Sequence, residues 1–218
     1  GIPKETSFQE CRIALTPLSV ALLVANGHKV VIETGAGVAA NFSDKDYSEQ
    51  GAQISFSKKD VYAADIIVKI APPTLEEIGL MHKGQTLISA LQIGTLKEAN
   101  LKAILHKKIN ALCFENLRDE GNVLSVVRAM GEIVGAASIF IAAEYLSSAF
   151  GGKGLMLGGF TGVPPTEIVI IGAGTVGEYA IRSALGLGAA VKVFDNSLSR
   201  LRRLQNDLGQ RIYTSVLN

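Results

Sequence analysis

The chain has 218 residues, enough for one large domain or two small ones, and 48% of them are apolar. Only 19% are charged, a low fraction that is typical of buried parallel sheets. The net charge of +1 does not indicate the basic surface of a nucleic-acid-binding protein. The two cysteines, Cys11 and Cys113, form no CxxC pair and have no metal-ligand spacing. We therefore predict free thiols, no metal site and a cytoplasmic location.

The N-terminal residues are polar and contain no signal-peptide core. The most apolar run, residues 133–150, carries Glu144 and is shorter than the roughly 20 residues that a spanning helix needs. We expect no membrane insertion.

The first half of the chain alternates helix and strand patterns with short turns. Its first predicted helix has Thr16 as N-cap, Pro17 at the first helical position and Gly27 as the stop. Further helices are predicted over residues 43–51, 58–64, 74–81 and 96–108, and strands over residues 29–35, 65–71, 85–91 and 110–116. This alternation indicates βαβ units and a largely parallel sheet.

In the second half, a turn at residues 118–122 precedes one long apolar helix over residues 124–148. Residues 150–165 are rich in glycine and end in two prolines, so we interpret them as a hinge segment and not as an ordinary linker. We predict an α/β fold of two parallel-sheet βαβ domains, residues 1–125 and 126–218, the second a partial Rossmann domain.

The stretch "IVIIGAGTVGEYAIRSALGLGAAVKVFD", residues 168–195, carries the strongest motif. Gly172, Gly174 and Gly177 follow an apolar strand and open a helix. In dinucleotide-binding proteins the first glycine permits a tight turn, the second lets the backbone approach the pyrophosphate, and the third lets helix and strand pack closely. The helix N-terminus offers N–H groups to the phosphates. With this context we favour a dinucleotide site over a purely structural glycine turn.

Asp195 ends the next predicted strand, where an acidic side chain accepts hydrogen bonds from the ribose of NAD and repels the 2′-phosphate of NADP. Arg200, Arg202 and Arg203 follow closely and are the argument for NADP. We assign them to a solvated helix face and predict NAD as the cofactor. Cofactor contacts are expected along the glycine loop and just beyond the second strand: Gly172, Ala173, Gly174, Thr175, Val176, Gly177, Asp195 and Asn196.

A nicotinamide cofactor needs two βαβαβ halves with a crevice between them. Residues 166–218 supply strand, helix, strand, helix and a third short strand in "QRIYTSVLN". We therefore expect this chain to be part of a longer protein that continues at its C-terminal end.

Ligands of open α/β sheets bind beyond the carboxyl ends of the strands. His28, His82 and His106 occupy helix-to-strand turns at the opposite edge, so we predict that they are solvated. Lys69, Gln92 and Glu115 stand at or near the productive edge, and Lys69 is either a snorkelling edge lysine or a cation that faces a small anion. Arg12 is suited to clamp a carboxylate with two hydrogen bonds.

Several motifs together resemble the family of alanine dehydrogenase and the soluble α subunit of nicotinamide nucleotide transhydrogenase. They are "GIPKE…RIALTP…LLVANGHKVVIETGAG", "ADIIVKIAPP", "MGEIVGAASI" and "GGKGLMLGGFTGVPPTEIVIIGAGTVGEYAIRSALGLGAAVKVFD". The resemblance covers essentially the whole chain, and the "GGKGLMLGG…GVPP" segment looks more like the alanine dehydrogenase branch.

The resemblance implies that the N-terminal domain holds the substrate and that the second domain binds NAD. It implies the reversible conversion of L-alanine, water and NAD to pyruvate, ammonia and NADH, by a protein that is a homo-oligomer. Arg12 corresponds to the arginine that holds the substrate carboxylate, Lys69 to a lysine that aids proton movements, and Met130 to a methionine that lines the cleft.

The chain departs from the family pattern at the acid–base position. The dehydrogenases carry a histidine where this chain has Gln92, a tyrosine where it has Ala90, and a serine near the cofactor phosphates where it has Gly131. The aspartate that completes the catalytic set falls outside this chain, so the chain by itself is expected to be inactive. Two alternatives therefore stay open: a transhydrogenase α subunit, and a non-catalytic NAD-binding module.

Overall fold

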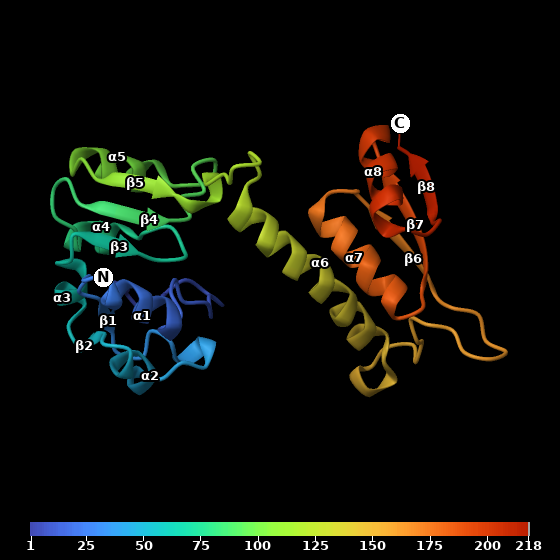
Figure 1. Ribbon diagram of the computed structural model, residues 1–218, viewed down its shortest axis with the longest axis horizontal. Helices are drawn as coiled ribbons and strands as arrows, with labels where there is room; N and C mark the ends of the chain where they lie inside the picture. The colour runs from blue at the N-terminus through green and yellow to red at the C-terminus, as the bar shows by residue number, and fades with distance from the viewer. Residues whose placement is uncertain (218) are drawn as a thin grey trace. The chain divides into compact units, whose positions relative to one another are not determined.

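The computed structural model describes residues 1–217, which form two compact units. The first unit is Gly1–Leu117 and the second begins at Arg118. Every paired strand in both units is parallel to its neighbours (Figure 1), so the predicted α/β class is confirmed. The boundary predicted near residue 125 lies a few residues after this division, at the start of helix α6, Ser125–Leu146.

In unit 1, β1 (Val31–Glu33) pairs with β2 (Gln53–Ser55), and β3 (Ile66–Val68), β4 (Thr86–Ser89) and β5 (Asn110–Cys113) pair in chain order. The N-terminal residues join these two sheets. The N–H of Ile2 donates to the Val31 carbonyl (2.9 Å), and the N–H of Val68 donates to the Gly1 carbonyl (3.0 Å). The sequence analysis predicted neither this pairing nor β2.

Three helices of unit 1 begin after a side-chain cap, and the cap of the first is the predicted Thr16. Thr16 caps α1 (Pro17–Ala25) by accepting from the Ser19 N–H, and Gly27, with φ 86°, ends it. Ser43 caps α2 (Asp44–Glu49) with a complete capping box, as Thr74 caps α4 (Leu75–Leu80). The other helical elements are α3 (Lys58–Tyr62), α5 (Glu98–His106) and two short 3₁₀ turns, Val38–Ala40 and Phe114–Asn116.

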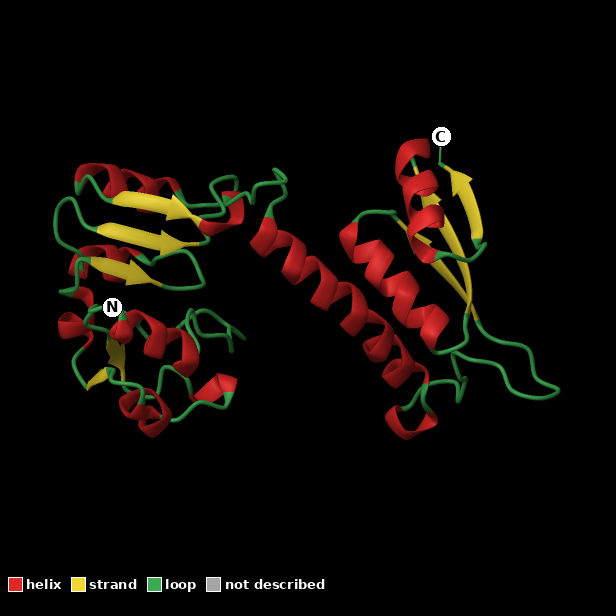
Figure 2. Cartoon of the chain, viewed as in Figure 1, coloured by secondary structure: helices red, strands yellow, loops and turns green. Residues whose placement is uncertain are grey.

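In unit 2, β6 (Glu167–Ile171), β7 (Ala190–Asp195) and β8 (Tyr213–Val216) form a sheet in chain order. The connections are α7 (Thr175–Gly186) and α8 (Leu198–Leu208), and the turn Ser148–Phe150 follows α6. Figure 2 shows α7 and α8 on the same face of the sheet, where Ile139, Ile181, Val193 and Leu204 form the buried core. This arrangement is the predicted first half of a doubly wound domain.

Helix α6 packs along α7 through a glycine. A Cβ atom on Gly135 would lie only 2.3 Å from the Val176 carbonyl oxygen, so the two backbones approach more closely than another residue would allow. By length and composition α6 is also apolar enough to cross a membrane. The core helix of a soluble protein can meet the same criteria, so this is weak evidence for a membrane span. The apolar run is thus part of a 22-residue helix, which lies within the residues 124–148 predicted for it.

Candidate functional site

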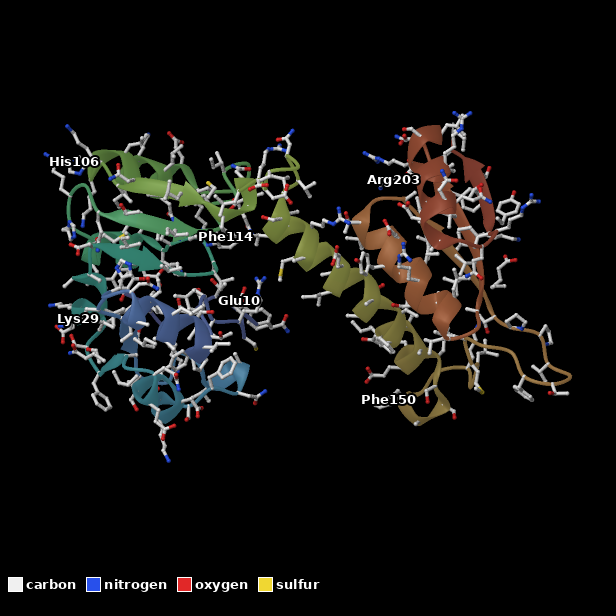
Figure 3. The ribbon with its side chains drawn as sticks, in the orientation of Figure 1. Glu10, Lys29, His106, Phe114, Phe150 and Arg203 are labelled. Carbon is white, nitrogen blue, oxygen red and sulfur yellow. The ribbon has the colours of Figure 1, made fainter. Side chains whose placement is uncertain are left out.

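The predicted substrate residues of unit 1 lie near the carboxyl edge of its strands. Figure 3 labels Glu10 and Phe114 on the side toward which the strands point, and His106 on the opposite side. This confirms that His106 lies at the other edge of the sheet, at the end of α5.

Arg12 is locked into a two-pronged ion pair with Glu10. Its Nε donates to Glu10 Oε1 at 2.7 Å and its Nη2 donates to Glu10 Oε2 at 2.6 Å. These hydrogen bonds lower the pKa of Glu10 and raise that of Arg12, so both groups are charged near neutral pH. The Arg12 side chain is half exposed, and its orientation is fixed by a partner that the sequence analysis did not assign.

Lys69 is buried, with 1% of its surface exposed. Its Nζ lies 3.2 Å from Glu77 Oε2 and 3.4 Å from Glu5 Oε2, and both carboxylates are also buried. The expectation of a snorkelling edge lysine is therefore wrong. The ammonium faces two carboxylates of its own unit.

Gln92 has an unusual backbone for a residue other than glycine, with φ 46° in the left-handed region. Glu115 Oε1 accepts hydrogen bonds from the N–H groups of Leu91 (2.9 Å) and Gln92 (2.8 Å). The Gln92 carbonyl accepts from the N–H groups of Thr95 (2.8 Å) and Leu96 (3.0 Å). Left-handed residues that are held this firmly tend to occur at functional sites.

The Gln92 side chain is exposed and helps to line a hollow of about 380 Å³ at the carboxyl edge, together with Pro73, Leu75 and Lys97. Glu115, which supports this turn, lies in the 3₁₀ turn Phe114–Asn116 that follows β5. The sequence analysis placed Glu115 at the productive edge without assigning it a role, since its link to the backbone of residues 91 and 92 is set by the neighbouring strand.

In unit 2, the glycine loop has the geometry of a phosphate-binding turn. Gly172 adopts φ 108°, and a Cβ on Gly177 would lie 1.9 Å from the Gly172 carbonyl oxygen, so position 177 admits no side chain. A Cβ on Gly174, by contrast, would meet no atom within 4 Å. The loop therefore leaves open space beside Gly174 and the N-terminus of α7, where the pyrophosphate of a dinucleotide would lie.

Asp195 is 4% exposed and binds the glycine loop. Its Oδ2 accepts from the Ala173 N–H and its Oδ1 accepts from the Ser197 N–H, each at 2.7 Å. These two bonds, with the Ala173 bond the larger cause, lower the pKa of Asp195, so the carboxylate is charged at neutral pH. Each oxygen keeps a further lone pair for a ribose hydroxyl, and the exposed Asn196 follows directly.

A groove of about 1220 Å³ runs along the loop and β6. Arg200 and Arg203 line it, and Figure 3 labels Arg203. Arg202 lines a separate hollow at the end of α8. Arg200 Nη1 lies 3.9 Å from Asp195 Oδ2, and the side chains of Arg200 and Arg203 are more than half exposed. The groove also contains Thr175, Val176 and Gly131, and Met130 precedes Gly131 on α6 in this unit.

Residues 1–134 match the family described as alanine dehydrogenase/PNT, N-terminal domain, and residues 138–218 match its C-terminal domain. The chain belongs to this family. It is 38% identical over 219 residues to an alanine dehydrogenase of Methanococcus maripaludis and 37% identical over 218 residues to that of Bacillus subtilis. All of this chain aligns with each, but it spans only 58% and 57% of their lengths.

Solved structures of the family agree. An L-alanine dehydrogenase structure superimposes with a TM-score of 0.92 at 37% identity, over 100% of this chain and 60% of that one. A transhydrogenase from Sinorhizobium meliloti gives 0.81 at 26% identity, over 99% of this chain and 60% of that one. The predicted family is thereby confirmed.

Proposed function

We propose that the protein containing this chain is an NAD-dependent oxidoreductase that interconverts L-alanine, water and NAD with pyruvate, ammonium, NADH and a proton. The main support for NAD binding is the Ala173–Asp195 hydrogen bond, which holds a charged carboxylate beside an open glycine loop. The substrate half is supported by the similarity of all 218 residues to alanine dehydrogenases. A cytoplasmic location and a homo-oligomer are part of the same proposal.

The glycine loop fits a dinucleotide. Gly174 leaves room at the N-terminus of α7, and the first N–H groups of that helix have no acceptor within it. Asp195 would accept from the adenosine ribose, and Thr175 and Val176 line the groove beside the loop. NAD, when bound, supplies the hydride acceptor at its nicotinamide ring.

In unit 1, we assign the substrate carboxylate to Arg12, whose guanidinium Glu10 orients. In the forward reaction the amino group would first lose a proton to water, and the Cα–H bond of alanine would then break as its hydride passes to NAD, which leaves an iminium ion. Water then adds to the imine carbon and ammonia leaves. Gln92 can donate or accept a hydrogen bond there, but its amide does not exchange a proton near neutral pH.

Gln92 also favours a second candidate, hydride transfer between two nucleotides, as in the transhydrogenase that this chain resembles structurally. That reaction needs no acid–base side chain for an amino acid. The third candidate is an NAD-binding module without catalysis, and it too is favoured by glutamine in place of an acid–base side chain at position 92.

The three candidates are separated by oxidation of NADH by the full-length protein. A rate that requires both pyruvate and ammonium supports the dehydrogenase. Reduction of an oxidised NAD analogue by NADH without pyruvate supports the transhydrogenase, and binding of NADH without any oxidation supports the non-catalytic module. Either of the last two results would contradict the proposal.

A further inference from the structure

The segment that carries Arg12 has neither helix nor strand between Pro3 and Thr16. Side chains and pairings at its two ends therefore decide where it lies. At the C-terminal end, the Tyr47 hydroxyl donates to the Leu15 carbonyl at 2.9 Å. Near the N-terminal end, the Lys4 N–H donates to Glu33 Oε2 at 2.9 Å, and the Glu5 carboxylate provides a second fastening.

Glu5 fastens the segment to the loop that follows β3. Its Oε1 accepts from the Ile70 N–H at 2.5 Å and its Oε2 lies 3.4 Å from the Ala71 N–H. Both N–H groups belong to the carboxyl edge of the sheet, where the proposed substrate site lies. The Arg12 segment is thus tied to the substrate edge by one buried carboxylate.

A buried carboxylate needs a compensating charge, and Lys69 provides it. Lys69 lies between Glu5 and Glu77, and Lys58 Nζ approaches the other oxygen of Glu77 at 3.9 Å. Two ammonium groups thus balance two carboxylates in one continuous row. With 1% of Lys69 exposed, its amine is committed to this row.

We propose that Lys69 is a positioning residue: it neutralises Glu5, so that Glu5 can hold the Arg12 segment at the carboxyl edge of β3, and it exchanges no proton with the substrate. This inference rests on the proposed function for the identity of the ligand of Arg12. It differs from the role that the family resemblance implied for Lys69.

The two roles give opposite results in a charge-balanced double variant. Lys69→Met leaves Glu5 and Glu77 with Lys58 alone, and truncating one partner of a buried pair is strongly destabilising. Adding Glu5→Gln removes the excess negative charge and keeps a carbonyl oxygen for the Ile70 N–H. A positioning residue is dispensable in this double variant, whereas a proton-transferring amine is not.

The experiment uses the full-length protein and compares wild type, Lys69→Met, Lys69→Met/Glu5→Gln and, as a matched control, the exposed Lys29→Met. Steady-state kinetics with pyruvate, ammonium and NADH give KM for pyruvate and kcat. Hydrogen–deuterium exchange of peptides covering residues 3–16, read by mass spectrometry without any substrate, reports the order of the segment.

We expect Lys69→Met to raise KM for pyruvate about tenfold or more, with kcat changed much less, and to speed exchange in residues 3–16. The double variant restores both values to near those of wild type, and Lys29→Met changes neither. If Lys69→Met does not fold, the double variant alone tests the proposal, because the proposal predicts that the double variant is active.

A loss of kcat of about 100-fold or more in the double variant would indicate proton transfer by Lys69 and overturn the proposal. Unchanged exchange and unchanged KM in Lys69→Met would overturn it as well. If wild type shows no oxidation of NADH with pyruvate, the proposed function fails instead. The exchange measurement then still tests whether Lys69 holds the segment.

Discussion

The backbone N–H of Ala173 donates a 2.7 Å hydrogen bond to the Asp195 carboxylate, which joins the glycine loop to the end of the neighbouring strand. Asp195 Oδ1 accepts from the Ser197 N–H in the same way. One charged group therefore shapes the loop and, in the proposed function, would select between the ribose of NAD and the ribose phosphate of NADP.

This relationship predicts a preference for NADH over NADPH. We expect wild type to bind NADH about tenfold or more tightly than NADPH, because the Asp195 charge repels the 2′-phosphate. Asp195→Asn keeps one acceptor oxygen but not the charge, so we expect it to reduce the difference between the affinities for NADH and NADPH. Fluorescence titration of the full-length protein with both cofactors measures this, with the exposed Asp207→Asn as control. Equal or tighter binding of NADPH by wild type would contradict the prediction.

The close contact at Gly177 predicts that a methyl group cannot be tolerated there. A Cβ would lie 1.9 Å from the Gly172 carbonyl oxygen, so Gly177→Ala must displace the loop and weaken NADH binding at least about tenfold. Gly186 lies in the same helix with no atom within 4 Å of its Cβ position. Gly186→Ala is expected to leave binding unchanged and to stabilise the protein by about 0.5–1 kcal/mol. Similar NADH affinities for the two variants would refute this interpretation of the loop.

The buried carboxylate of Glu77 is expected to make the stability of the fold sensitive to acid. Burial raises the pKa of this carboxyl group, but Lys69 and the Thr74 N–H lower it by more, so its pKa in the folded protein is below the ordinary value. The stabilising contribution is then complete above the unfolded pKa of about 4.3 and is lost as the pH falls through the folded pKa. We expect Glu77→Gln to reduce the fall in the urea midpoint between pH 6 and pH 3, roughly the range that spans both pKa values.

The neighbouring Glu76, whose side chain is largely exposed, is the matched control for that experiment. Glu76→Gln is expected to leave the acid dependence of the urea midpoint as it is in wild type. The same loss of acid dependence in both variants would assign the effect to general charge and not to the buried row.

Gln92 predicts a slow dehydrogenase that a histidine accelerates. General acid–base catalysis typically contributes about 10² to 10⁴ in rate, and glutamine lacks it. Histidine tolerates the left-handed backbone of this position better than most residues do. Gln92→His is therefore expected to raise kcat and to introduce a pH dependence of kcat at about pH 6 to 7. The control Gln92→Ala is expected neither to raise kcat nor to introduce this pH dependence. A wild-type kcat on the order of 10 s⁻¹ or more with no gain from histidine would show that position 92 has another role.

Local signals in the sequence predicted most of the elements. The Thr16 cap, the Gly27 stop and the glycine loop are each encoded by residues within one turn of the feature, so a single sequence suffices. Strand β2 is only three residues long, and the pairing of Gly1 and Ile2 depends on strands far along the chain. Neither leaves a periodic pattern in the sequence.

The side-chain partners were harder to predict for the same reason. Sequence position placed Lys69 at the carboxyl edge of a strand, but not under Glu5 and Glu77, which approach it from two other segments. Glu115 similarly reaches the backbone of Gln92 from the next strand. Contacts of this kind follow from strand order and register, which periodicity does not specify.

The most direct test of the central claim is to follow the hydride itself. The full-length protein is supplied with pyruvate, ammonium and NADH that carries deuterium at both hydrogens of nicotinamide C4, and the alanine formed is analysed by mass spectrometry. If the protein is an NAD-dependent alanine dehydrogenase, the alanine carries one deuterium at Cα, and it forms only when pyruvate, ammonium and the cofactor are all present. Binding of NADH without formation of deuterated alanine would contradict the account.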